Sequence, residues 1–179
     1  MSETLVRNAV KELLVDNSNL FVSGLETQGN PRVIHQISKS QLTPPTGYYY
    51  INIYVTTVDV EDNPKFKTTS IPPSQAIYSI NIEISDYAYQ AIDDEDQLFE
   101  KMDGEFQLLT DRIVAKIRES RWITDNSTSK EFKLYNSRRV SKNNLSTSWE
   151  EASQYHALLY SRITFQVIDE CTDDVNLYT

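Results

Sequence analysis

The stretch that decides the fold reads Ala76-Ile77-Tyr78-Ser79-Ile80-Asn81-Ile82-Glu83-Ile84-Ser85. Apolar side chains alternate with polar ones, which is the period of two expected of a strand buried on one face. One face carries Ala76, Tyr78, Ile80, Ile82 and Ile84, and the other carries Ser79, Asn81, Glu83 and Ser85. We therefore expect one face in the core and one face exposed to solvent. On the exposed face, a Glu83→Gln substitution should have almost no effect on folding.

A second strand is predicted before it, over residues 48–58. One of its faces carries Tyr49, Ile51, Ile53 and Val55, and the other carries Tyr48, Tyr50, Tyr54 and Val58. The segment between the two strands, Asp59 to Gln75, contains charged residues and prolines. It is too polar for a core and longer than a usual hairpin connection. We expect this loop to be mobile in the free subunit and to become ordered on assembly.

A long amphipathic helix is predicted to follow, from Glu95 to Glu119. Acidic residues at 93–96 suit the positive end of the helix dipole. An apolar stripe at helical spacing comes next and consists of Leu98, Phe99, Met102, Phe106, Leu109, Ile113 and Ile117. At 1.5 Å per residue this helix would span roughly 37 Å. The same periodicity predicts a shorter helix at the N-terminus, over Leu5 to Leu14.

The rest of the chain predicts further strands. They are expected at Leu20–Leu25, Val33–Ile37, Phe132–Tyr135, Arg138–Leu145 and Tyr155–Ile168. The acidic tail, residues 169–179, is expected to be flexible. The predicted fold class is therefore α+β, in a single domain over residues 1–179. It has a mostly antiparallel β-sheet, a long helix packed on one face and a short N-terminal helix.

Composition argues against several classes of function. The chain has 179 residues and a net charge of −9, which disfavours binding to the phosphate backbone of nucleic acids. Its single cysteine, Cys171, cannot form a disulfide within the chain. The N-terminus lacks a basic leader, and the Leu13-Leu14-Val15 cluster is too short to span a membrane. We expect a soluble protein in the cytosol of the cell that makes it.

No motif for catalysis or for cofactor binding can be assembled. Four glycines are too few, and too scattered, for a phosphate-binding loop or a dinucleotide fingerprint. His35 and His156 lie in no nucleophile motif. The acidic clusters at 59–62 and 93–96 lack the glycine and the terminal glutamate of a calcium loop, and a solvated loop and a helix cap account for them. We expect no catalytic residue, no cofactor and no metal.

Three groups of residues are candidates for a protein interface. The first is the tyrosine stripe Tyr48, Tyr50 and Tyr54, because tyrosine is enriched at interfaces, although it also suits a half-exposed sheet. The second is the charged loop with Asp59, Glu61, Asp62, Lys65 and Lys67. The third is a basic patch, which could meet an acidic surface of a neighbouring subunit or be a solvated hairpin. Its members are Arg138 and Arg139, with Lys142, Arg118, Arg121 and Lys130 nearby in the sequence.

This order of elements resembles the tail terminator, or tail-completion, proteins of long-tailed bacteriophages. The two strand segments Tyr48-Tyr49-Tyr50-Ile51-Asn52-Ile53 and Ile80-Asn81-Ile82-Glu83-Ile84 contribute to the resemblance. The resemblance implies a small acidic subunit that forms a hexameric ring on the tail tube, stops its polymerisation and docks the tail to the neck and head. It implies four partners: further copies of the chain, the tail tube protein, neck or connector proteins, and a sheath where the tail has one. It implies a place at the tail–neck junction of the virion and, during assembly, in the host cytoplasm. Neither a sequence-specific nucleic acid nor a membrane is expected as a partner.

Three other functions are compatible with the same sequence. A head-completion or head–tail connector protein would have the same composition and would bind a different part of the virion. A hydrolase using the acidic loop would need a divalent ion and would lose activity on Asp59→Asn. A binding module would stay monomeric at every concentration.

Overall fold

A long β-sheet is the framework of the computed structural model, which describes residues 2–27, 30–31, 33–39, 49–62, 74–92, 104–136 and 139–170. The helices are α1 (Ser2–Asp16), α2 (Ser18–Val22) and α4 (Gln107–Glu119). The strands are β1 (Glu26–Thr27), β2 (Asn30–Pro31), β3 (Ile34–Ser38), β4 (Tyr49–Asp62), β5 (Ser74–Ile92), β6 (Trp122–Asp125), β7 (Lys130–Tyr135), β8 (Ser141–Asn144), β9 (Thr147–Glu151) and β10 (Gln154–Asp169).

Eight of the described strands form one sheet in the order β3-β4-β5-β10-β7-β6, while β8 and β9 also pair with β10. Only β3 and β4 run parallel among these pairs. The centre is the pairing of β5 with both β4 and β10, which places Ile82 opposite Ile53 and Ile163. The prediction of a mostly antiparallel sheet with few helices is confirmed.

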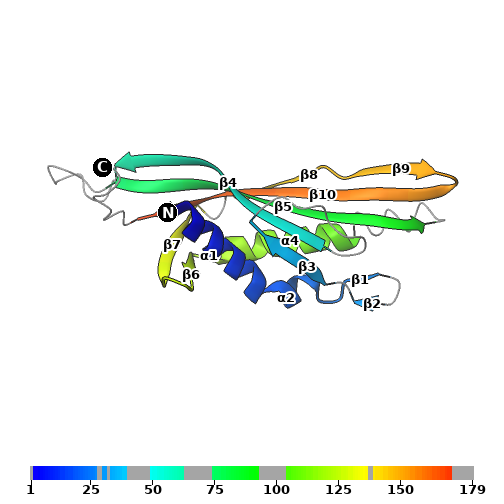
Figure 1. The fold of residues 1–179 in the computed structure, drawn as a ribbon, viewed down its shortest axis with the longest axis horizontal. Helices are drawn as coiled ribbons and strands as arrows, with labels where there is room; N and C mark the ends of the chain where they lie inside the picture. The colour runs from blue at the N-terminus through cyan, green and yellow to red at the C-terminus, as the bar shows by residue number, and fades with distance from the viewer. Residues whose placement is uncertain are drawn as a thin grey trace.

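The three helices of the described residues lie on one face of this sheet (Figure 1). The alternating isoleucines of β5 point toward them, and Ile80, Ile82 and Ile84 are fully buried. Facing side chains come from both longer helices and include Val6, Val10, Leu14, Leu109, Ile113 and Ile117, all fully buried. Burial of apolar area from both layers is the main stabilising term of such a fold. The short helix predicted at the N-terminus is confirmed as α1, with 15 residues.

The prediction of a long helix is wrong. The described helix has 16 residues, which comprise a π turn at residues 104–106 and α4. Glycine is a poor helix former and stands at the first of these positions. The acidic residues predicted to start the helix lie outside the described residues. A helix of this length spans about 24 Å, whereas the 19 residues of β5 span about 60 Å.

The sheet therefore extends beyond its helices at both ends (Figure 1). At one end lies the hairpin that we call the β4–β5 arm, formed by Asp59–Asp62 and Ser74–Ile77. Asp59, Glu61 and Asp62 were predicted to lie in a loop. They are instead paired with Ile77, Gln75 and Ser74, because the ladder of β4 and β5 continues to these residues and β10 supports its base through the pair Ile168 and Ile77. The rest of the predicted loop, residues 63–73, lies outside the described residues.

One further prediction, near the end of an element, is wrong. Residues 20–25, predicted as a strand, contain the end of helix α2 followed by Gly24 with a φ of 72°. The side chain of Asn17 donates to the carbonyl of Leu13 at 2.7 Å, which favours a helical chain reversal over a strand. The polar residues after Trp122 contain strand β6, whose last residue, Asp125, accepts hydrogen bonds from the turn that follows it.

Candidate interaction surface

The face of the sheet opposite the helices is the largest candidate site. In the described part of the chain no helix lies on it (Figure 1). We call it the helix-free face and define it by the outward residues of its three central strands. They are Tyr50, Asn52 and Tyr54 from β4, Ser79, Asn81 and Glu83 from β5, and Tyr160, Arg162, Thr164 and Gln166 from β10.

Hydrogen bonds connect these three strands at the middle of the face. The Tyr54 hydroxyl donates to Oε1 of Glu83 at 2.6 Å, and Arg162 donates to the same oxygen from Nη2 at 2.8 Å and from Nε at 3.2 Å. Arg162 Nη2 also lies 3.4 Å from the hydroxyl of Tyr160. One row away, Thr164 Oγ1 donates to Oδ1 of Asn81 at 2.7 Å. Such networks fix the position of every member.

The network holds its groups in one charge state at neutral pH. Burial and, after it, the hydrogen bond to Glu83 raise the pKa of Tyr160 to about 12. Burial also acts to raise the pKa of Glu83. Hydrogen bonds from Tyr160, Tyr54 and Arg162 outweigh that effect, so the pKa of Glu83 lies below its usual value. A general acid or base needs a pKa near the working pH, so this arrangement suits a fixed surface better than proton transfer.

The Glu83 environment overturns the expectation that this residue is wet, since only 9% of it is exposed. We expect Glu83→Gln to lower the free energy of unfolding by about 1.5 kcal/mol at pH 7, because hydrogen bonds to a charged group are lost. The folded-state pKa is lowered, so the advantage of wild type is full above 4.5 and disappears as pH falls through the folded value. Urea titrations from pH 7 to pH 3 measure it. Glu131→Gln, at an exposed site, is the control, and an equal loss for both variants at pH 7 contradicts the account.

The predicted tyrosine stripe is only partly accessible. Tyr50 and Tyr54 lie on the helix-free face, as the alternation predicts, but Tyr50 is only 5% exposed and the hydroxyl of Tyr54 is engaged by Glu83. Tyr48 lies outside the described residues. Among the side chains that the structure describes, the exposed aromatic ones are instead Trp122, Tyr135 and Trp149. They were missed because each stands alone in the sequence and only the strand pairing shows its exposure.

The predicted charged interface residues are distributed over the molecule. Asp59 is exposed on the β4–β5 arm, and Glu61 and Asp62 follow it on the same strand. Arg139 is exposed, whereas Lys65, Lys67 and Arg138 lie outside the described residues. Two other lysines of the predicted basic patch are paired within the chain: Lys142 with Asp111, and Lys130 with Asp169 at 2.5 Å.

Two arginines of the predicted basic patch lie at the end of α4. Arg118, Arg121 and Lys133 line an open hollow of about 410 Å³ that is completed by Glu119, Ser120, Leu134 and Asn136. We call it the basic hollow. Arg121 is exposed, Arg118 donates to the carbonyl of Val140 at 3.3 Å, and Lys133 pairs with Glu170 at 2.8 Å. Arg118 and Arg121, two residues of the predicted basic patch, therefore lie together. Lys133 joins them, although the sequence did not indicate it.

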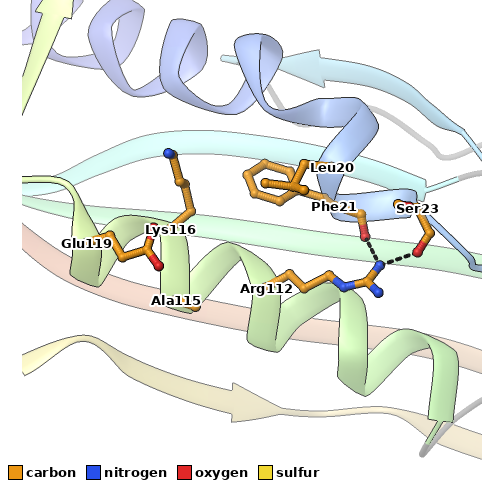
Figure 2. Close-up of a pocket in the computed structure, with 7 residues that line it drawn as sticks. All are labelled: Leu20, Phe21, Ser23, Arg112, Ala115, Lys116 and Glu119. Carbon is orange, nitrogen blue, oxygen red and sulfur yellow. Dashed lines mark hydrogen bonds between the residues drawn. The ribbon is translucent and has the colours of Figure 1, made fainter.

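A second hollow, of about 270 Å³, lies between α2 and α4 (Figure 2). Arg112 reaches from α4 to the end of α2, where its Nη1 donates to the carbonyls of Phe21 at 3.0 Å and Ser23 at 2.6 Å. Carbonyls at the end of a helix need such partners. Arg112 therefore holds α2 against α4, which gives this hollow a structural explanation.

No metal-binding cluster was found beside either hollow among the described residues. In the ranges that the structure describes, no three His, Cys, Asp or Glu residues are grouped so as to hold a metal ion. No described helix is both long and apolar enough to cross a bilayer. No family model matches this chain, and no curated protein matches it.

Proposed function

We propose that this chain is a ring-forming structural protein of a tailed bacteriophage, a tail terminator that caps the tail tube, stops its polymerisation and docks the tail to the neck. One observation carries the proposal: hairpins of the sheet project beyond the helices at opposite ends of the subunit (Figure 1). A subunit with different contact surfaces at its two ends joins head to tail, and such contacts close into rings when the rotation permits. The resemblance of the sequence to tail terminators supports the same conclusion.

The helix-free face supports this function in a second way. Its centre is a polar network fixed by Glu83 and Arg162, and exposed Trp122, Tyr135 and Trp149 stand on the same sheet. Tyrosine, tryptophan and arginine are the residues enriched at protein interfaces. A rigid and partly aromatic surface suits contact with a tube or a neck ring, because little conformational entropy is lost when it binds.

The charge of the subunit fits a ring through which DNA passes. A net charge of −9 gives a surface that repels phosphates on average, so DNA in the lumen would not be held. The same charge suits a head–tail connector, and the function as a terminator is therefore tested by what the protein does to tube growth.

Growth of tail tubes in the presence of the protein tests the proposal. When tail-tube subunits of the same phage polymerise in a light-scattering cell, we expect the protein to stop elongation at far less than one copy per tube subunit, because one ring caps one end. A connector or a monomeric binding module would not stop growth at such ratios. Undiminished elongation at equimolar protein contradicts the proposal, and co-purification with connector proteins would favour the head–tail connector instead.

A further inference from the structure

We propose that the acidic tip of the β9–β10 hairpin of one copy binds the basic hollow of a second copy, forming the head-to-tail contact of the assembly. This inference rests on the proposed function to the extent that the chain must associate with itself. The two surfaces are the tip residues Trp149, Glu150 and Glu151, and the basic hollow with Arg121 at its opening.

The hairpin tip is a protruding and well-defined structure. Every residue of β9, Thr147–Glu151, is exposed. The indole of Trp149 stacks on the imidazole of His156 with ring centroids 5.5 Å apart and planes 14° apart, which orients the indole on the helix-free face. Ala152 and Ser153 form the turn with φ values of 53° and 63°. Two residues with positive φ make the tight primed turn that matches the twist of paired strands, so the tip is narrow.

The basic hollow lies at the other end of the sheet. Along β10, Trp149 is opposite His156 and Lys133 is opposite Ile168. Those twelve residues of strand separate the two sites by about 40 Å. Figure 1 shows the same separation, with β9 at one end and β6 and β7 at the other. A tip that enters the hollow of the next copy therefore makes a heterologous contact, which repeats around a ring.

Charge makes the next copy the partner that fits the hollow. Arg118, Arg121 and Lys133 line it together with one acidic residue, Glu119, and Lys133 is already paired with Glu170. Exposed Arg139 lies beside the hollow, because its backbone N–H donates to the carbonyl of Asn136 at 2.7 Å, so cations still outnumber carboxylates there. The tip brings two exposed carboxylates and one aromatic ring. Exposed ion pairs contribute little each, so the charges set partner and orientation, while Trp149 supplies the contact energy expected of an aromatic anchor.

A second acidic hairpin, the β4–β5 arm, offers a different contact. It lies at the same end of the molecule as the basic hollow (Figure 1). If this arm docked into a neighbour's hollow, the neighbour's arm could dock into the first copy's hollow in return. The result would be a two-fold symmetric dimer. The β9–β10 tip, at the far end, gives the head-to-tail contact that a ring requires, and charge reversal at each hairpin distinguishes the two arrangements.

Mixing two charge-reversed variants tests the contact in trans. Sedimentation velocity over a concentration series at low ionic strength should show wild type assembling. Glu150→Arg with Glu151→Arg should weaken self-association by about 100-fold, and so should Arg121→Glu with Arg139→Glu, because each brings like charges together. An equimolar mixture of the two variants should assemble again, since each reversed tip then meets an oppositely charged hollow. Thermal melts confirm that both variants fold.

The control reverses charge on the other acidic hairpin, with Asp59→Arg and Glu61→Arg, and should assemble like wild type. Failure of the mixture to assemble, or loss of assembly in the control, overturns the inference. A wild-type chain that is monomeric at all concentrations but stops tube growth also overturns it and leaves the proposed function intact. A chain that neither associates nor stops tube growth overturns both.

Discussion

Replacing Ile82 with aspartate is expected to prevent folding. Ile82 is fully buried at the centre of the sheet, with Ile53 opposite it on β4 and Ile163 opposite it on β10. A carboxyl group placed there has no hydrogen-bond partner, and its burial costs several kcal/mol in addition to the lost apolar contacts. A domain of this kind has a total stability of about 5–15 kcal/mol. Circular dichroism and thermal melts of the purified variant measure the effect.

Two companion substitutions make this test quantitative. Ile82→Ala should fold but lose about 3–4 kcal/mol, because it removes three carbons from a packed site. Val58→Asp places the same carboxylate on the same sheet at a side chain that is 45% exposed. It should cost less than about 1 kcal/mol. Equal losses for Ile82→Asp and Val58→Asp would show that the strand register described here is wrong.

The second large effect is expected for Arg162→Met. This change leaves the carboxylate of Glu83, which is 11% exposed, without its cation. Removing one partner of a fully buried pair costs 3–5 kcal/mol. We expect about 3 kcal/mol here, at the lower end, because the Arg162 side chain is 42% exposed and water replaces part of the interaction. Urea denaturation at pH 7 gives the value.

A double-mutant cycle separates the ion pair from other effects. Adding Glu83→Gln to Arg162→Met should restore part of the lost stability, since no unpaired carboxylate then remains. Lys142→Met is the matched control, because its partner Asp111 is 56% exposed, and it should cost less than about 1 kcal/mol. Additive losses for Glu83→Gln and Arg162→Met would contradict the central role given to this pair.

Sequence patterns predicted the parts of the fold that depend on local periodicity. The alternation in 76–85 and 155–168 located β5 and β10, and helical spacing located α1. The pattern failed where distant contacts decide the structure. The apolar residues around Leu20 form a helix that Arg112, ninety-one residues from Phe21 in sequence, holds at its end. No local signal in residues 20–25 contains that information.

The candidate interaction surface could be predicted only in outline. The sequence singled out a tyrosine stripe, a charged loop and a basic patch as candidates, but the network on the helix-free face joins Glu83 to Arg162 across 79 residues, so it depends on strand register. Tyr49 was correctly predicted to point toward the core, whereas Tyr50, which was expected to be accessible, is nearly buried. Lys133 and Trp149 were not identified because their neighbours in space come from other strands.

Electron microscopy of the purified protein, alone at high concentration and mixed with tail tubes of the same phage, tests the central claim most directly. We expect closed rings of uniform diameter, with one ring at an end of each tube. We also expect Glu150→Arg with Glu151→Arg to remove the rings formed by the protein alone. Fields that contain only 20.7 kDa monomers, beside tubes with bare ends, would contradict it.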